Sequence, residues 1–532
     1  MIIPAIRQAR VAARAGCLAV SLVGIFIEAP AAFAQAEPAK PAKTELTPTK
    51  LAPAEGGGGS AVAHGPEWRI VPSISVQESF DDNVRQAVPG KEESDFTTTV
   101  SPGIDISRQG LSNIFHLNYA FSVIRHKDSD DLDRYQHQLS EASTTIFLPE
   151  SLFLDTRASV SQQVINSAGS ISAVNANAPK NNLTTVSNFS LSPYWRSRYQ
   201  GWVNSELRYS FSGSIAGSGQ VSDTTTNRIT ETLSNGPEFS RLLWTATLDD
   251  SETDRGGSTQ VIAGTTNQST TVSRRLAQFS PEYLVNSYVS LLGGVGYEVI
   301  EDPSLRNDIR EPIGSVGVKL RPGPRTVLIG QLNHRFERNY FTGSASYLLG
   351  PTIRIDASYT EGIETSQSLA NNQLSFLGTD EFGNFVDSRT AQAFQIGDNS
   401  FSLSDSAFRQ KRSEVRGNAV LGRNTYNLLA FSEERTTDQT LITQSSYGVT
   451  ANYHRLVNLL TDFNLTGRYR LTDFGTSDGR RDEQLGASAF LTYRLTNTLQ
   501  GTLSYDLLIR TSNVANQDST ENVVTVGLRK TF

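Results

Sequence analysis

The side chains best suited to chemistry in this sequence are six histidines and several groups of carboxylates. No two histidines stand four residues apart or within an HExxH motif, so the helical arrangement that binds catalytic zinc is missing. No Gly-x-Ser-x-Gly turn occurs with a histidine and an acid placed to activate its serine. Asp128, Asp130 and Asp131 have the oxygens that Ca²⁺ prefers, although such a run is more often a solvated loop. We therefore expect no enzyme, no cofactor and no metal ion.

The single cysteine, Cys17, lies in an N-terminal segment with the pattern of a secretory signal peptide. Three arginines between positions 7 and 14 precede an apolar run over 18–27, and Ala32-Phe33-Ala34 offers small residues for cleavage. The apolar run is shorter than the roughly 20 residues that a membrane-spanning helix needs. Cleavage after Ala34 leaves a chain without thiols, and this excludes disulfides and thiolate metal sites.

The next segment, residues 35–66, is rich in Pro, Ala, Glu and Lys and contains Gly56-Gly57-Gly58-Gly59-Ser60. This composition predicts a disordered linker in the periplasm. The expected organisation is therefore a signal peptide over 1–34, a linker over 35–66 and a folded domain over 67–532. The net charge of −7, without a long basic block, argues against nucleic acid as a partner.

The folded domain consists of segments of roughly 10–15 residues in which apolar and polar side chains alternate. In the segment 499–510 the odd positions are mostly apolar, and the even positions are mostly Gln, Thr, Ser, Asp and Arg. The segment 461–471 sets Phe463, Leu465 and Tyr469 against polar residues in the same way. A period of two indicates strands with two unlike faces. A membrane barrel exposes only one face of each strand to lipid, so its average composition stays polar. The charged fraction of 19% and the mean hydropathy of −0.32 agree with this.

The turns between these segments alternate between short and long along most of the chain. A soluble β-sandwich has no reason to keep this alternation, and a propeller would show a repeated blade motif. Short periplasmic turns and longer extracellular loops are typical of a transmembrane antiparallel up-and-down β-barrel, and the segments number about 22, with counts down to about 18 also open. Short turns lie at 108–110, 148–151, 198–201, 321–324, 350–351, 422–424 and 495–498, and long loops lie at 81–93, 164–181, 256–267, 361–407 and 511–520.

The last segment ends in a row of apolar residues that points to one face: Val524, Val526, Leu528 and Phe532. A terminal aromatic on the closing strand resembles the assembly signal of bacterial outer-membrane proteins, and an aromatic suits the membrane interface. Lys530 interrupts the row, but a lysine near the interface can extend its amine to the lipid head groups. We expect outer-membrane lipids and the barrel-assembly machinery as partners.

The opening of the domain, Trp68-Arg69-Ile70-Val71-Pro72-Ser73-Ile74-Ser75-Val76-Gln77-Glu78-Ser79-Phe80-Asp81-Asp82-Asn83-Val84, leads into the segment 92–104. Together with 191–209, these residues resemble a family of porin-like outer-membrane β-barrels associated with exopolysaccharide gene clusters and PEP-CTERM sorting systems. The resemblance covers roughly the first third of the barrel and brings no catalytic residues. It implies an outer-membrane pore that helps to export or assemble extracellular polysaccharide, with polysaccharide and periplasmic export components as partners.

The polar faces of the strands predict the side chains that line the lumen. They combine cations with carboxylates such as Asp155, Glu206 and Asp506, which suits either an anionic polymer or a mixed, self-paired interior. Inward aromatics such as Tyr194 and Trp202 are candidate platforms for sugars. The basic lumenal candidates are Arg157, Arg196, Arg208, Arg241, Arg335, Arg354, Arg468, Arg470, Arg494 and Arg510.

Three further functions remain alternatives to polysaccharide export. A general diffusion porin would need only an open polar lumen, and a structural or adhesive barrel would act through its long loops, above all 361–407. A TonB-linked transporter is disfavoured, because barrels of that class carry a plug and only residues 35–66 precede this one.

Overall fold

The computed structural model describes residues 68–217, 221–256, 261–262, 265–266, 270–379, 385–387, 392–393, 401–438 and 440–532. The expected signal peptide and linker lie outside these residues. No helix in this part of the chain has the length and apolar run that a membrane crossing needs.

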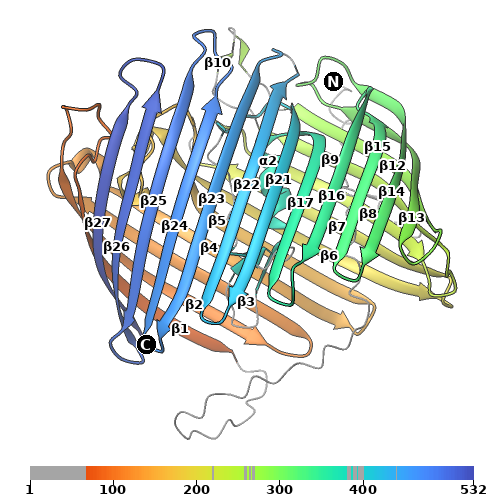
Figure 1. The fold of residues 1–532 in the computed structure, drawn as a ribbon, viewed down its shortest axis with the longest axis horizontal. Coiled ribbons are helices and arrows are strands. Elements are labelled where there is room, and N and C mark those ends of the chain that lie inside the picture. Colours follow the sequence, from red (N-terminus) through yellow and green to blue (C-terminus); the bar gives the residue numbers. More distant parts are fainter. Residues whose placement is uncertain are drawn as a thin grey trace, which may run out of the picture.

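Twenty-two antiparallel strands form one closed sheet, because β1 pairs with β27 and every other strand pairs with its neighbours along the chain (Figure 1). This confirms the expected β-barrel and its expected number of strands. The strands are β1 (Arg69–Asp81), β2 (Asp95–Gln109), β3 (Asn113–His126), β4 (Arg134–Leu148), β5 (Leu152–Val164), β6 (Leu183–Tyr199), β7 (Val203–Ala216), β8 (Thr224–Asn235), β9 (Leu242–Arg255), β12 (Thr270–Leu284), β13 (Val289–Glu301), β14 (Ile309–Gly323), β15 (Thr326–Arg335), β16 (Arg338–Leu348), β17 (Ile353–Glu364), β21 (Phe408–Leu421), β22 (Asn424–Thr437), β23 (Thr443–Asn458), β24 (Thr461–Asp473), β25 (Arg481–Arg494), β26 (Leu499–Ser512) and β27 (Ser519–Thr531).

Short elements occupy the loops between these strands. They are η1 (Asp130–Leu132), η2 (Asn175–Asn177), η3 (Lys180–Asn182), β10 (Val261–Ile262), β11 (Thr265–Thr266), α2 (Ser366–Leu374), β18 (Leu377–Thr379), β19 (Phe385–Asp387) and β20 (Gln392–Ala393).

The two ends of the barrel differ in their connections, as the turn rhythm predicts. At the short-turn end, β4 and β5 are joined by residues 149–151 and β21 and β22 by 422–423, and the first and last strands also reach this end. At the long-loop end, the connections include 165–182 and 365–407. The β15–β16 hairpin is an exception, because only Phe336 and Glu337 join its strands, with φ of 58° and 60°.

Alternate residues of each strand face opposite sides of the wall. On β27, Val524, Val526 and Leu528 are exposed on the outer face, whereas Glu521 and Val523 are buried on the inner face. Exposed aromatics such as Trp195 and Tyr505 share the outer face. An apolar outer face and a polar inner face are what a barrel in a membrane requires.

The closing strand carries the terminal aromatic at the short-turn end. The backbone N–H of Phe532 donates to the Pro72 carbonyl on β1 at 3.0 Å, and its ring is exposed. Lys530 lies on the outer face, where its amine donates to the Thr498 hydroxyl in a short turn at 2.6 Å. The lysine therefore extends toward the polar edge of the barrel and not along its apolar band.

Candidate functional site

The described parts of the long connection between β17 and β21 lie in the lumen. Its helix α2 begins at a capping box, in which Thr365 accepts from the Ser368 N–H and the Ser368 hydroxyl accepts from the Thr365 N–H. The helix lies against β5, β6 and β7. From β6 the wall runs through β7, β8, β9, β12, β13, β14, β15 and β16 to β17, so α2 reaches a wall nine strand positions from its origin among 22 (Figure 1).

Residues beyond α2 continue toward the short-turn end. Halfway down β5, Arg157 donates through Nε to the Leu377 carbonyl at 2.6 Å. Leu374 and Leu377 are buried with Ala142 of β4, and Phe385 packs against this cluster. Phe385 also stacks on His116, the fourth residue of β3, with ring centroids 4.5 Å apart. The described parts of this loop therefore contact the wall from the long-loop end almost to the short-turn end.

A second connection, residues 165–182 between β5 and β6, also turns inward. Asn177 donates to the Asp81 carboxylate of β1 at 2.5 Å and accepts from the Thr97 hydroxyl of β2 at 3.2 Å. Asp81 and Thr97 both lie on the inner face and are fully buried. This loop thus reaches over the lumen to β1 and β2.

The same loop is also bound by side chains of β27 and β26, on the other side of β1. Glu521 of β27 accepts from the Ser172 hydroxyl at 2.5 Å and from the Ala173 N–H at 2.6 Å. Arg510 of β26 donates to the carbonyls of Gly169 and Ala168 at 2.6 and 2.7 Å. Because carboxylates and guanidinium groups form the stronger class of hydrogen bond, the loop is firmly fixed to this wall.

The two inward loops meet each other at the long-loop end. The Leu403 N–H donates to the Ile165 carbonyl at 3.0 Å, and the hydroxyls of Ser167 and Ser402 lie 3.2 Å apart. Asp405 accepts from Gln367 of α2 and from the Ser222 N–H in the β7–β8 loop. These contacts join two loops that are more than 200 residues apart in the sequence.

An ion pair joins two further loops at this rim, outside the strands. Both terminal nitrogens of Arg85 donate to the carboxylate of Asp131, at 2.9 and 2.8 Å, and Arg85 Nε donates to Glu93. The Arg85 guanidinium holds the pKa of Asp131 below its usual range. The aspartate therefore stays ionised well into acidic solution, and the link between the two loops persists.

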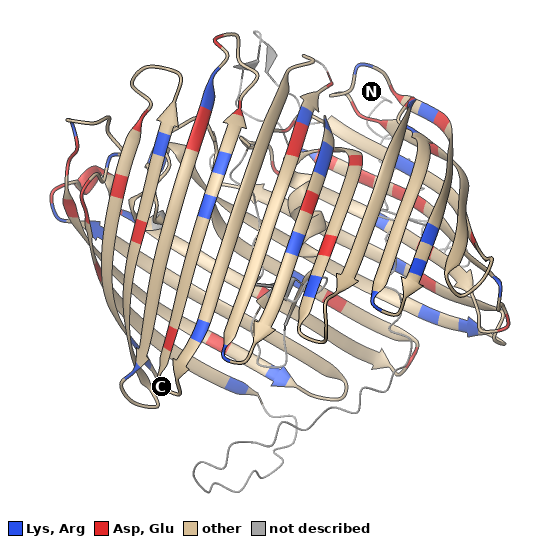
Figure 2. Cartoon of the chain, viewed as in Figure 1, with Lys and Arg blue, Asp and Glu red and all other residues tan. Residues whose placement is uncertain are grey.

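The structure places most of the sequence-predicted arginines against acids or carbonyls of the inner face. Arg208 pairs with Asp155 at 3.0 Å and with Glu206, and Arg196 also binds Glu206. Arg335 pairs with Glu298, Arg354 with Asp356 and Arg510 with Asp482, whereas Arg157 binds carbonyls. Figure 2 shows the resulting alternation of positive and negative bands along β17 and β21.

The remaining predicted arginines lie apart from these pairs. Arg241 lies in the turn before β9, where its carbonyl accepts from the Leu284 N–H, so it belongs to the short-turn rim. Arg494 ends β25 at the same rim. Arg468 and Arg470 stand on the inner face of β24, near the middle of the wall.

Neither predicted sugar platform is available in the lumen. Tyr194 is only 6% exposed, because the guanidinium of Arg208 lies 3.8 Å from its ring centroid. The interpretation of Trp202 as a pore residue is wrong, since it lies in the β6–β7 turn and packs edge-on against Phe239. Phe239 in turn packs against Trp244, on the outer face of β9.

A lumenal aromatic that sequence reasoning missed is Phe490. It lies on the inner face of β25, directly opposite Asn464 and Ser504, and is 40% exposed. The signal was present in the sequence, because Phe490 is a lone aromatic in the row of Gln484, Ser488, Thr492 and Arg494.

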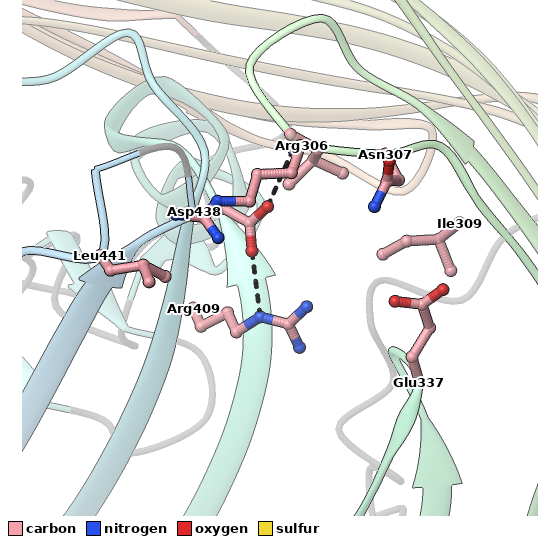
Figure 3. Close-up of a pocket in the computed structure, with 8 residues that line it drawn as sticks. Arg306, Asn307, Ile309, Glu337, Arg409, Asp438 and Leu441 are labelled. Atoms are coloured by element: carbon pink, nitrogen blue, oxygen red, sulfur yellow. Dashed lines mark hydrogen bonds and ion pairs between the residues drawn. The ribbon is translucent and has the colours of Figure 1, made fainter.

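A small cavity lies at the long-loop rim, between the β13–β14 loop and the β22–β23 turn (Figure 3). Its volume is about 280 Å³. Asp438 accepts from Arg409 Nε at 3.3 Å and from the Arg306 N–H at 3.0 Å, so the carboxylate of Asp438 is bound within the lining. Within the described ranges, no group of three or more His, Cys, Asp or Glu side chains is placed to hold a metal ion.

Comparisons with known proteins support a barrel of the porin kind. Residues 430–532 match the family model described as "Putative beta-barrel porin 2". The FrpB iron transporter from Neisseria meningitidis has a similar fold, with a TM-score of 0.50 and 10% identity over 87% of this chain and 81% of that one. The siderophore receptor PirA from Acinetobacter baumannii gives a TM-score of 0.48 and 9% identity, over 87% of this chain and 80% of that one. No curated protein matches the chain.

The protein is an outer-membrane β-barrel. Its short-turn end, which carries both the first and the last strand, therefore faces the periplasm, and its long-loop end faces the cell exterior. At 10% identity the likeness to the iron transporter concerns the fold alone. The two inward loops thus occupy the extracellular half of the lumen, and the 365–407 loop also reaches the periplasmic half.

Proposed function

We propose that this barrel is a channel for the export or assembly of extracellular polysaccharide. The observation that carries the proposal is the path of the 365–407 loop, which lies along the inner wall from Gln367 at the extracellular end to Phe385 near the periplasmic end. A loop in this position narrows a polar lumen along its length, and lumenal groups then select what passes. The resemblance of the first strands to barrels of exopolysaccharide gene clusters supports polysaccharide as the class of polymer.

The same observation weighs against an adhesive barrel. Adhesion needs loops that project from the cell, whereas the described parts of the longest loop lie against the inner wall through Arg157, Leu377 and Phe385. A general diffusion porin remains the second candidate, because it too uses a polar lumen with an inward constriction.

The purified full-length protein in planar lipid bilayers tests the proposal. We expect discrete conductance steps, which brief closures interrupt when a polysaccharide is added to the periplasmic side; dextran and polygalacturonate serve as neutral and anionic probes. Conductance without closures by either polymer would identify a general diffusion porin. Folded protein that inserts without any conductance would rule out both channel functions.

A further inference from the structure

One part of the inner wall differs from the rest, namely the face formed by β23, β24, β25 and β26. Its residues near mid-height and below are mainly Asn, Ser, Thr and Gly, with one exposed aromatic ring and two neighbouring arginines. Within the 365–407 loop, α2, Leu377 and Phe385 contact β3 to β7, across the lumen from this face.

The exposed ring is Phe490. Among the strand residues that the structure describes, it is the one Phe, Tyr or Trp on the inner face that is more than a third exposed. Exposing a large apolar ring to a water-filled lumen costs free energy, roughly 25 cal/mol per Å² of apolar surface. Such a ring is expected where a ligand covers it, and the flat face of an aromatic suits the apolar face of a pyranose.

Polar side chains surround the ring of Phe490. Asn464, directly opposite Phe490, accepts from Asn452 at 2.8 Å, and Asn452 also donates to Thr466 at 2.9 Å. One rung above, Asp506 accepts from the hydroxyls of Ser488 and Ser504 at 2.6 and 3.1 Å. Amides, hydroxyls and a carboxylate held in fixed positions can exchange hydrogen bonds with the hydroxyls of a sugar.

Arg468 stands above this polar cluster on the inner face of β24. Its side chain lies across Gly486, where an added Cβ would come within 2.8 Å of its Cγ and Nε. The arginine is exposed, and none of the described carboxylates lies within 4.0 Å of its guanidinium. An exposed guanidinium without an acid is ready to bind an anion through paired hydrogen bonds.

Other arginines at mid-height have partners within the protein, and those of Arg157 on β5 are backbone carbonyls. Arg412 and Arg416 of β21 both pair with Glu414, and Arg208 of β7 pairs with Asp155 and Glu206. The positive charge at Arg468 is therefore not a general property of the lumen. It is local to the face that also exposes Phe490.

We infer that this face is a binding lane for an anionic polysaccharide, with Phe490 stacking on a sugar ring and Arg468 pairing with a carboxylate of the polymer. This saccharide lane comprises Phe490, Asn464, Asp506 and Arg468. Phe490 and Arg468 are four residues apart along paired strands, which corresponds to about 13 Å, so one chain contacts both through neighbouring sugars. The inference rests on the proposed channel function and adds the charge class of its polymer.

Blockage of the current by two oligosaccharides tests the saccharide lane. Oligogalacturonate is the anionic probe and maltodextrin of equal length is the neutral one. We expect R468Q to weaken blockage by oligogalacturonate about tenfold, as the loss of one charge-assisted contact predicts. Blockage by maltodextrin should stay within about twofold of the wild-type value. F490A should weaken both probes several-fold, because both present sugar faces to the ring.

Two control variants separate specific from general effects. R354Q removes a lumenal arginine of another wall that is already paired with Asp356, so it should leave both probes unchanged. F490L keeps an apolar side chain without an aromatic face and should behave as F490A does. It also serves as the stacking test if F490A does not fold.

The outcomes distinguish the two proposals. If both probes block the wild-type channel, and if they block the R468Q and F490L channels equally well, the saccharide lane is wrong and the channel function stands. If neither probe blocks the wild-type channel, polysaccharide transport itself fails, and the saccharide lane fails with it.

Discussion

Glu298 illustrates how single residues make a charged lumen compatible with a stable wall. Its carboxylate is completely buried on the inner face of β13. It accepts from Arg335 of β15 at 2.6 Å and from Arg274 of β12 at 3.0 Å, so one acid satisfies cations from both neighbouring sides. A buried charge is tolerable only with such partners.

Replacing this acid should therefore destabilise the barrel. In E298A two guanidinium groups lose their shared carboxylate, and we expect the free energy of unfolding to fall by about 3–5 kcal/mol. Urea titration of the protein in detergent micelles, followed by tryptophan fluorescence, measures the change. The matched variant D356A breaks the more exposed pair with Arg354 and should cost no more than about 1 kcal/mol. Equal losses in the two variants would contradict this account.

At the scale of residues, the alternation along a strand predicts which side chains lie on the inner face. It does not predict which of these side chains form ion pairs. Arg157, Arg208 and Arg510 lie on the inner face because a period of two fixes the side of every residue once one is known. Which of them are neutralised depends on neighbours from other strands, and the sequence of one strand does not contain these. Phe490 was missed because an average over the polar face hides a single aromatic residue.

At the scale of elements, the contact between the two inward loops is the least local feature of the fold. Since no other cysteine occurs after Cys17, an engineered pair can report on this contact directly. The Ser167 and Ser402 hydroxyls are 3.2 Å apart, and we expect S167C/S402C to form a disulfide under mild oxidation. Non-reducing electrophoresis after proteolysis would detect the link, which joins fragments from the two loops.

A displaced partner provides the control for this cross-link. In S112C/S402C one cysteine is moved to the β2–β3 turn at the periplasmic end, and no link should form. Cross-linking of this second pair, or none in the first, would mean that the loops do not meet as described.

The closing strand is the element whose role in assembly can be tested most simply. Phe532 is bonded to β1 through its backbone and exposes its ring at the periplasmic edge. If the terminal aromatic is part of an assembly signal, F532A should lower the amount of folded protein in the outer membrane several-fold. The folded fraction can be read from the heat-dependent shift in gel mobility. F147A, which removes another exposed aromatic near the same edge, should have little effect.

Sequence reasoning predicted the strands well and the loops hardly at all, and the reason is physical. A strand between lipid and water repeats the same two environments at every second residue, so its pattern is visible in the chain. The 165–182 and 365–407 loops have no such repeated environment. Their positions depend on Asp81, Glu521, Arg157 and Ser222, which come together only when the barrel has closed.

At the scale of the whole molecule, the wall does not need the longest loop. β17 and β21 pair directly from Ile353 with Ala419 to Glu364 with Phe408, so a short turn could join them. Replacing residues 366–406 by Asn-Gly should leave a folded barrel, whose mobility in a gel still shifts on heating. We expect its single-channel conductance to rise several-fold, because the cross-section of the lumen grows. Unchanged conductance would mean that the loop does not limit the current.

The loop over 165–182 has a consequence for how the cylinder stays shut. The seam between β1 and β27 has 9 paired residues, compared with 13 between β1 and β2. The loop binds Asp81 on one side of this seam and Glu521 on the other, so it ties the first and the last strand together. In a nascent barrel that is still open between β1 and β27, Asp81 and Glu521 would not yet lie close enough for the loop to bind both. Docking of the loop would then come last during assembly and would resist any later sideways parting of the two strands within the bilayer.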